Sequence, residues 1–336
     1  MRTMLYGQLI SRGLVAVAEL GIAELLAPGP RTVRDIAGEL GTHEQATRRL
    51  LEGLTTFGVF ESTGDDAYGL TGLGTALCAD TPGTAAPTAL LLGLGVGQAW
   101  AELTSAVRTG KSAFAEVFGE PFFDHLTDGE EIRAIFHRSQ AAAVTAELAG
   151  LAEHVTQGGY RRLVDVGGGD GTVLCAILAR SESAGGIVFD APAVAAQAAS
   201  TIARAQLTGR CNAQGGDFFD QVPAGGDLYL LSRVVHDWSD EDVTRILGTC
   251  RAAMGGDATL MIVDYVLGDG AERMGAIMDL YMMSLFGADG GRERTLAEFT
   301  RLLEGAGFTL TGHRTLDSGM GVLEARPAIG TGESTP

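Results

Sequence analysis

The stretch LVDVGGGDG, residues 163–171, joins an apolar run, broken only by Asp165, to a turn that contains four glycines. Glycine tolerates positive φ and lets a ligand approach the backbone closely. A strand, a glycine-rich turn and a helix in this order form the phosphate- or nucleoside-binding corner of doubly wound α/β folds. The stretch therefore predicts a strand that ends at a ligand site.

Asp165 decides which ligand fits this turn. It lies two residues before the first glycine, where a carboxylate would repel a pyrophosphate. The dinucleotide pattern G-x-G-x-x-G would need a glycine at Thr172, and the lysine of a P-loop is absent. The carboxylate instead suits a cationic ligand, such as an ammonium next to a sulfonium.

Two further acidic positions follow the next predicted strands. GIVFD ends in Asp190, which can hydrogen-bond a ribose diol, and GGDFF places Asp217 and Phe218 where an adenine amine and ring would lie. Together these residues describe a positively charged adenosine without phosphate, namely S-adenosylmethionine. The alternative remains open that GGGDG is only a tight turn and that the aspartates belong to surface turns.

Strand-like and helix-like runs alternate from Arg161 onward, which predicts a parallel, doubly wound sheet. The expected strands are LVDV, GIVFD, NAQGGDFF, DLYLLSRVV and ATLMIVDYVL, with a closing pair formed by FTLTGHRTL and MGVLEA. The fold class predicted for this part of the chain is therefore α/β.

The N-terminal part has a different pattern. Residues 5–27 predict an amphipathic helix or helix pair, and residues 32–71 predict two helices around Gly41 and two short strands around GDD. This is a winged-helix pattern. Residues 30–62 contain four arginines against five acidic residues, whereas a helix that reads a DNA groove needs a basic face. A packing or dimerisation module is favoured. A loop is expected at residues 78–88 and helices at 90–155.

Composition narrows the possible partners. The 336-residue chain has a net charge of −18 and a pI of about 4.7, which disfavours nucleic acids and anionic membranes. Its four cysteines show no CxxC spacing, so we expect a reducing cytoplasmic setting and no structural zinc. No signal peptide or membrane span is expected, since the apolar stretches are shorter than the ~18 residues a span needs.

HDWSDED places His236 just after an expected strand, at the sheet edge where doubly wound folds carry their chemistry. Histidine is the usual general base near neutral pH, with an unperturbed pKa of about 6.5. Ser239 is expected to cap the next helix, with acidic residues in its first turn. From position alone, a structural histidine remains an alternative.

From Val164 to Phe308 the chain resembles the S-adenosylmethionine-dependent O-methyltransferases of natural-product pathways. This family includes plant caffeate and flavonoid enzymes and bacterial polyketide-tailoring enzymes. The matching motifs are LVDVGGGDG, GDFF, HDWSDED and GGRERTLAEFTRLLEGAGF. The resemblance implies a Rossmann-like methyltransferase sheet in residues 158–326 and a mostly helical, winged-helix-like dimerisation domain in residues 1–100. Residues 101–157 would be a helical connector that contributes to the substrate pocket, and residues 327–336 a flexible tail.

The resemblance also implies site residues. His236 falls on the catalytic base, Glu293 on an acid that orients it, and Asp264 where many plant members have a second acid, usually glutamate. Ser232 falls near a lysine that contacts the cofactor in plant members. The cofactor-binding set is Asp165, Gly167, Gly169, Asp190, Asp217, Phe218 and Ser232.

The acceptor is expected against MDLYMMSLF, residues 278–286. Met278, Tyr281 and Met282 share a helix face, and methionines adapt to flat aromatic ligands. Plain core packing is an equal alternative for this face. Trp100 is a weaker candidate for a lid over the substrate.

The expected reaction transfers a methyl group from S-adenosylmethionine to a hydroxyl, most simply phenolic, of a small specialised metabolite such as an aromatic polyketide, and releases S-adenosylhomocysteine. A cytoplasmic homodimer is expected. Three alternatives stay open: a same-fold enzyme that performs C-methylation, hydroxylation, decarboxylation or cyclisation; a ligand-sensing winged-helix regulator; and a nicotinamide dehydrogenase, which Asp165 disfavours.

Overall fold

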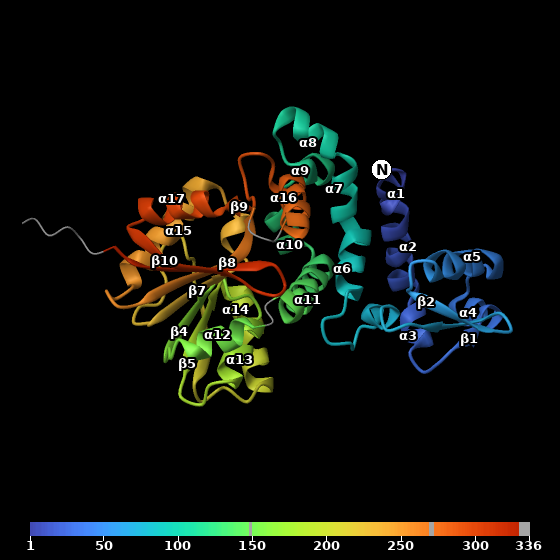
Figure 1. Ribbon diagram of the computed structural model, residues 1–336, viewed down its shortest axis with the longest axis horizontal. Helices are drawn as coiled ribbons and strands as arrows, with labels where there is room; N and C mark the ends of the chain where they lie inside the picture. The colour runs from blue at the N-terminus through green and yellow to red at the C-terminus, as the bar shows by residue number, and fades with distance from the viewer. Residues whose placement is uncertain (148–149, 269–271, 329–336) are drawn as a thin grey trace, which may run out of the picture. The chain divides into compact units, whose positions relative to one another are not determined.

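The computed structural model describes residues 1–147, 150–268 and 272–328 (Figure 1). The chain forms two compact units. The first comprises Met1–Ala101 and Phe123–Thr145, and the second comprises Glu102–Phe122 and the chain from Ala146 onward. The connector expected at residues 101–157 is thus divided between the two units. Most of the tail expected at 327–336 lies outside the described residues.

The first unit begins with a winged helix, as predicted. Its helices are α1 (Arg2–Leu5), α2 (Gly7–Leu20), α3 (Ile22–Leu26), α4 (Val33–Leu40) and α5 (Glu44–Thr55). A three-stranded sheet has the order β1 (Arg31–Thr32), β3 (Ala67–Leu70), β2 (Phe60–Gly64). Gly41 ends α4 in the left-handed conformation, which glycine adopts without steric cost. The buried face of these elements packs around Ile22, Ile36 and Leu51.

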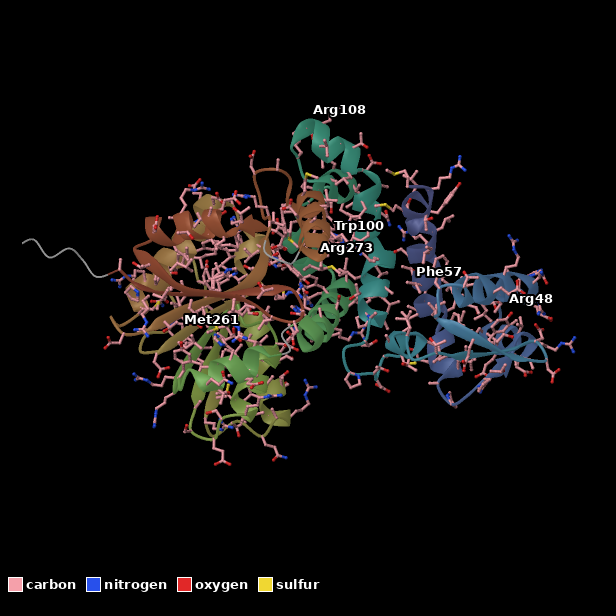
Figure 2. The ribbon with its side chains drawn as sticks, viewed as in Figure 1. Arg48, Phe57, Trp100, Arg108, Met261 and Arg273 are labelled. Carbon is pink, nitrogen blue, oxygen red and sulfur yellow. The ribbon has the colours of Figure 1, made fainter. Side chains whose placement is uncertain are left out.

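The rest of the first unit is helical. It contains the 3₁₀ turn η1 (Gly74–Leu77), α6 (Ala86–Leu91), the π-helical turn η2 (Leu92–Val96), α7 (Gly97–Ala101), most of α10 (Phe122–Asp128) and α11 (Glu130–Glu147). The loop expected at 78–88 was wrong at its end, because α6 already begins at Ala86. Pro87 occupies the first turn of α6, where its missing N–H costs no hydrogen bond. Trp100 lies on α7 and is 39% exposed (Figure 2).

The second unit is built on one large sheet with the strand order β10-β11-β8-β7-β4-β5-β6. Five neighbouring strands run parallel: β4 (Arg162–Val166), β5 (Gly185–Asp190), β6 (Cys211–Gly215), β7 (Leu228–Ser232) and β8 (Thr259–Leu267). β10 (Phe308–Thr315) and β11 (Met320–Pro327) add an antiparallel edge. The short strand β9 (Arg294–Thr295) pairs with β8 and was not foreseen. The α/β fold class is confirmed.

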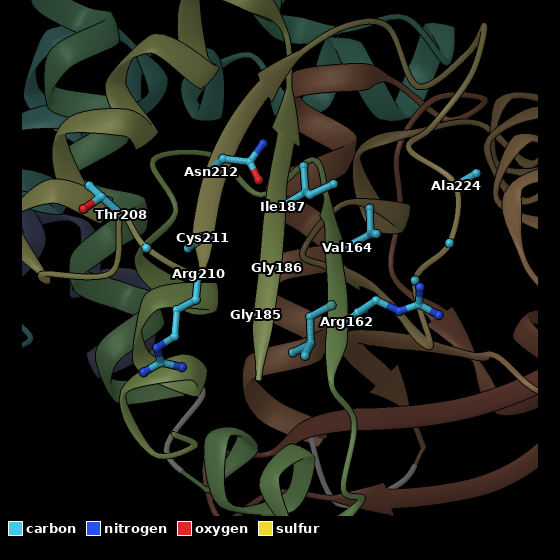
Figure 3. A pocket seen from close by; sticks show the side chains of 14 residues that line it. Arg162, Val164, Gly185, Gly186, Ile187, Thr208, Arg210, Cys211, Asn212 and Ala224 are labelled. Carbon is cyan, nitrogen blue, oxygen red and sulfur yellow. The ribbon is translucent and has the colours of Figure 1, made fainter. Parts of the chain in front are cut away.

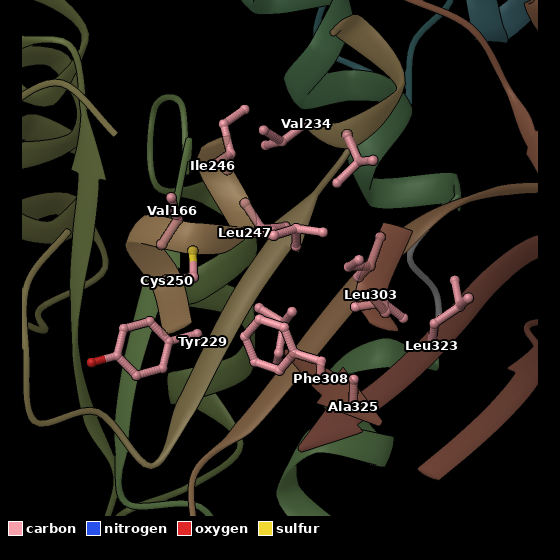
Figure 4. Packing of buried hydrophobic residues seen from close by; sticks show 14 of the residues in the cluster. Val166, Tyr229, Val234, Ile246, Leu247, Cys250, Leu303, Phe308, Leu323 and Ala325 are labelled. Atoms are coloured by element: carbon pink, nitrogen blue, oxygen red, sulfur yellow. The ribbon is translucent and has the colours of Figure 1, made fainter. Parts of the chain in front are cut away.

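Helices surround this sheet. They are α8 (Leu103–Thr109), α9 (Ala113–Phe118), α12 (Leu151–Gln157), α13 (Thr172–Ala179), α14 (Pro192–Arg204), α15 (Asp240–Ala253), α16 (Glu272–Phe286) and α17 (Leu296–Gly305). In the main core, Ile246 and Leu247 of α15 and Leu303 of α17 pack with Tyr229 of β7 and Leu323 of β11 (Figure 4). Burying each such aliphatic side chain contributes about 1.5–3 kcal/mol.

The strand order locates a switch point. From β4 the chain moves outward to β5 and β6, and then returns to build β7 and β8 on the other side of β4. The chain therefore leaves β4 and β7 in opposite directions at their carboxyl ends, and at such a switch point doubly wound folds bind ligands in a crevice.

No single helix in the described ranges is long and apolar enough to cross a membrane. One bent pair, Ala86–Ala101 with Leu103–Thr109, passes the same test of length and composition.

Candidate active site

The glycine turn after β4 lies directly against the segment that follows β7. Gly167 has a φ of 70°, and its N–H donates to the carbonyl of Phe189 at 2.8 Å. A Cβ added at Gly167 would lie 2.7 Å from Cγ2 of Val234, closer than real side-chain atoms approach. Glycine is required here both by its backbone angle and by lack of space, so this turn is held tightly beside the switch point.

Asp165 lies beneath this turn with no hydrogen-bond partner. The residue is 1% exposed, and neither carboxyl oxygen contacts a donor among the residues the structure describes. Burial, together with the nearby Asp190, Cys175 and Asp170, raises the pKa of Asp165 to about 8. A buried polar group without a partner is rare in folded proteins and calls for a ligand with hydrogen-bond donors.

The raised pKa of Asp165 makes the stability of the protein depend on pH. The folded state keeps a proton on Asp165 up to a pH of about 8, whereas the unfolded chain releases it near ~3.9. Stability is therefore lost as the pH rises between these two values. We expect the free energy of unfolding of Asp165→Asn, taken relative to that of wild type, to be about 3 kcal/mol larger at pH 8 than at pH 5.5. Urea unfolding at the two pH values measures this difference.

Asp257→Asn is the matched control, because Asp257 is exposed in the turn before β8. Its stability relative to wild type should not change between the two pH values. The same flat response for Asp165→Asn would contradict the assigned protonation of Asp165.

Asp190 holds the glycine turn in shape. Its Oδ2 accepts from the N–H of Gly169 at 2.8 Å, and its Oδ1 accepts from the N–H of Ala191 at 2.7 Å. A carboxylate oxygen can accept more than one hydrogen bond, so these contacts leave capacity for a diol.

The other predicted cofactor residues lie on the same edge of the sheet. Asp217, which is exposed after β6, accepts at Oδ1 from the N–H of Phe219 at 2.8 Å. The half-buried ring of Phe218 lies edge-on to Trp238, with centroids 5.7 Å apart. The Oγ of Ser232, at the end of β7, is buried and has no hydrogen-bond partner in the described parts of the chain. An unsatisfied hydroxyl at this place is a second sign of a polar ligand.

His236 lies in the 3₁₀ turn η3 (Val235–Asp237), directly after β7, and is 3% exposed. Its Nδ1 is 2.9 Å from Oε1 of Glu293. Since a carboxylate can only accept, Nδ1 carries the hydrogen and Nε2 faces the other way. Oδ1 of Asp237 is 3.6 Å from Nε2, and Oδ1 of Asp264 is 3.9 Å from Nδ1. The shorter Asp264 therefore stays beyond hydrogen-bond distance of the imidazole.

The charge on His236 differs from the sequence-based expectation. Burial lowers its pKa, but Glu293, Asp264 and Asp237 outweigh burial and raise the pKa to about 10. This pKa departs from the unperturbed value of about 6.5, because three carboxylates that are distant or adjacent in sequence converge on one ring. The site as it stands holds an imidazolium at neutral pH.

Gly291 explains how Glu293 reaches the histidine. A Cβ at Gly291 would lie 2.5 Å from the carbonyl oxygen of His236 and 2.6 Å from the carbonyl carbon of Asp237. The backbone before Glu293 thus packs directly on the turn that carries His236. The N–H of Glu293 donates to Oδ1 of Asp279 on α16 at 3.1 Å, which fixes the segment from its other side.

The expected acceptor face lies on α16. Met282 is buried, whereas Met278 and Tyr281 are half-buried. Burial and the neighbouring Asp237 raise the pKa of the Tyr281 hydroxyl, so this face lies near the histidine turn. Trp100 belongs to the first compact unit, and its role as a lid over the substrate stays a prediction.

Sequence reasoning did not foresee Asp237 beside Nε2, nor the fully buried Arg294. Both directly follow a predicted site residue, His236 and Glu293 respectively. The only sign of these two residues in the sequence was the position of a charged residue directly next to a buried one.

A hollow of about 420 Å³ lies elsewhere on the sheet, at the starts of β4, β5 and β6 (Figure 3). Arg162, Gly185 and Cys211 line it. Because ligands of doubly wound folds bind at the carboxyl ends of the strands, this hollow is separate from the candidate site.

Two protein-family models match the chain. An O-methyltransferase domain model matches residues 100–309, and an O-methyltransferase dimerisation domain model matches residues 3–80. The O-methyltransferase SfmM3 of Streptomyces lavendulae is 46% identical over 330 residues, which are 97% of this chain and 99% of that protein.

Two solved structures are similar over nearly the whole chain. The crystal structure of LaPhzM has a TM-score of 0.89 at 36% identity and covers 96% of this chain and 97% of its own. NcsB1 from neocarzinostatin biosynthesis, an O-methyltransferase in complex with S-adenosyl-L-homocysteine and 1,4-dihydroxy-2-naphthoic acid, has a TM-score of 0.81 at 31% identity. The match covers 95% of this chain and 96% of that one.

Proposed function

Since the chain belongs to the S-adenosylmethionine-dependent O-methyltransferase family, we propose that it methylates a phenolic hydroxyl of a small aromatic specialised metabolite, such as an aromatic polyketide, with His236 as general base. One observation carries the proposal: His236 is paired with Glu293 at 2.9 Å at the end of β7, the strand beside the glycine turn of β4. The aromatic hydroxy acid in the NcsB1 complex supports the substrate class.

The residues of the crevice fit the cofactor. Asp165 offers a buried carboxyl without a partner in the described chain, and Ser232 a hydroxyl in the same state. Gly167 allows the turn to lie directly against Val234, in the segment that follows β7. We propose that these residues, with Gly169, Asp190, Asp217 and Phe218, hold S-adenosylmethionine, whose sulfonium supplies an activated methyl group.

The chain itself contributes alignment and proton handling. Holding two reactants in attack geometry can supply roughly 7–11 kcal/mol. His236 faces the acceptor with Nε2, while Glu293 fixes the ring through Nδ1. A phenol has a pKa near ~10, similar to the pKa of about 10 of His236, so a proton shared between them is close to balanced.

The resting imidazolium has a consequence for proton flow. At pH 7 the imidazolium must first lose its proton to solvent, which costs about 4 kcal/mol for a group with a pKa of about 10. The neutral imidazole then accepts the proton of the acceptor hydroxyl at Nε2 as the oxygen takes the methyl group, and this restores the imidazolium beside the carboxylates. Reaction rate should therefore rise with pH across the neutral range.

Mass spectrometry and NMR of the product test the proposed reaction. The enzyme, S-adenosylmethionine and a panel of phenolic aromatics should give products that gain one methyl group on oxygen. Binding of S-adenosylmethionine without any O-methylated product, or methylation on carbon, would favour the diverged-chemistry alternative.

Asp190→Ala is expected to weaken binding of S-adenosylmethionine by about 10-fold or more, because a charge-assisted hydrogen bond contributes about 1.5–3 kcal/mol. Calorimetric titration measures the dissociation constant. Asp190→Asn is the matched variant: it keeps one acceptor for the glycine turn and should lose less affinity. Unchanged affinity in the alanine variant would remove Asp190 from the cofactor site.

We further propose that the enzyme is a cytoplasmic homodimer. The dimerisation model covers residues 3–80, where Met4, Leu5 and Leu9 expose 70–78% of their surface although they are apolar. The four cysteines, all within the described chain, are free, as expected in a reducing compartment. A monomer in sedimentation velocity at micromolar concentration would contradict the dimer.

A further inference from the structure

Arg294 is a completely buried arginine next to the catalytic pair. It is 0% exposed and belongs to β9, directly after Glu293. Its guanidinium donates to the carbonyl of Val235 at 2.9 Å and to the carbonyl of Trp238 at 2.7 Å. It also donates through Nε to Oδ1 of Asp240 at 2.9 Å.

These contacts enclose the histidine. Val235 immediately precedes His236, and Trp238 ends the 3₁₀ turn that contains it. The rigid, planar guanidinium of Arg294 therefore binds both ends of the turn that carries the His236 imidazole. The backbone of Arg294 follows directly from Glu293, so Arg294 is connected to both members of the pair. The five fixed donors of a guanidinium suit this role, and the compact ammonium of a lysine does not.

We propose that Arg294 is a positioning residue that sets the distance between His236 and Glu293 and thereby aims Nε2 at the acceptor. It acts through His236 and contacts neither reactant. This inference rests on the proposed function of His236 as base.

Charge supports the same role. Glu293, Asp264 from β8 and Asp237 from the turn itself face the imidazole. Burial raises the pKa of Asp264 to about 7, and Arg294, the buried cation behind this carboxylate group, opposes that rise. Without the guanidinium of Arg294, repulsion among these three carboxylates would push the histidine turn and the Glu293 segment apart.

Arg292 provides a matched comparison two residues earlier. It also pairs with Asp240, at 3.1 Å, and with Glu298, at 2.8 Å, but its side chain makes no contact with the histidine turn among its described interactions. Arg292→Lys therefore replaces a guanidinium in the same surroundings and leaves the contacts of Arg294 with Val235 and Trp238 intact.

The test is a double-mutant cycle. Arg294→Lys and Arg292→Lys are each made in wild type and in His236→Ala, with turnover of a phenolic acceptor, S-adenosylmethionine affinity by calorimetry, and thermal unfolding as readouts. We expect Arg294→Lys to lower kcat about 10–100-fold, the scale of a misplacement of about 1 Å, with little change in cofactor affinity. Arg292→Lys should stay near wild type.

The decisive arm is the His236→Ala background. There Arg294→Lys should cause no further loss, because the residue it positions is gone. In a proton spectrum, the downfield Nδ1 resonance of His236 should shift or broaden in Arg294→Lys and not in Arg292→Lys. An equal loss in both backgrounds, a large loss of cofactor affinity, or full activity of Arg294→Lys overturns the proposal.

Asp240→Asn serves if Arg294→Lys does not fold. Asp240 is the partly exposed partner of the guanidinium, with 41% of its side chain accessible. This variant should lower kcat by about 3-fold or more, again only when His236 is present. A loss that persists without His236, or no loss, counts against Arg294. If His236→Ala alone keeps full turnover, the proposed function fails first, so the two failures are distinguishable.

Discussion

His236→Ala is expected to lower kcat by about 10²–10⁴-fold, the usual contribution of a general base, while S-adenosylmethionine binds almost as tightly as to wild type. The reason is geometric. His236 is buried in the turn after β7 and is tied to Glu293, whereas the proposed cofactor cradle is formed chiefly by Asp165, Gly167 and Asp190. The substitution removes the proton acceptor and leaves the cradle in place.

Single-turnover assays and calorimetric titration measure the two effects separately. His154→Ala is the matched control, since His154 lies on α12 and pairs with Glu324 at 2.6 Å, away from the catalytic turn. A parallel loss of turnover and cofactor affinity in His236→Ala would assign the histidine to folding of the crevice.

Glu293→Gln is expected to have the second-largest effect, a loss in kcat of about 10²-fold or more, by analogy with the orienting acids of other catalytic histidines. An amide of the same size can present its N–H₂ to Nδ1 and so disturb the ring orientation. The charge effect has a definite sign. Glu293 is foremost among the carboxylates that raise the pKa of His236 to about 10, so its removal lowers that pKa.

Nitrogen-15 NMR of labelled histidine follows this pKa directly, with His236→Ala used to assign the resonance. Glu298→Gln is the control: Glu298 caps α17 and binds Arg292, without contacting the imidazole. An unchanged His236 pKa in Glu293→Gln would contradict the electrostatic account of this site.

Local features were predictable from sequence because neighbours in the chain determine them. Ser239 caps α15, accepting from the N–H of Asp242 at 3.1 Å. The glycine turn of residues 167–171 follows a strand and precedes a helix. Gly41 separates two helices. In each case a residue type has a backbone preference that acts within a few positions, so the pattern is sufficient.

Properties that depend on distant segments were not predictable. The raised pKa of His236 needs Glu293, 57 residues later, and Asp264 from another strand. The clamp of Arg294 on Val235 and Trp238 also joins segments far apart in sequence. Only the family resemblance pointed to Glu293, and it carried no information on charge state. Burial and convergence of charges follow from tertiary structure, which periodicity does not encode.

The contact at Gly291 has a consequence for redesign. Main chain lies against main chain there, so the segments that carry His236 and Glu293 are held together by backbone atoms and leave no room for a side chain at position 291. Libraries that include residues 290–294 would therefore mostly yield inactive clones, so laboratory evolution toward new acceptors should target the proposed acceptor face of α16 at Met278 and Tyr281 instead.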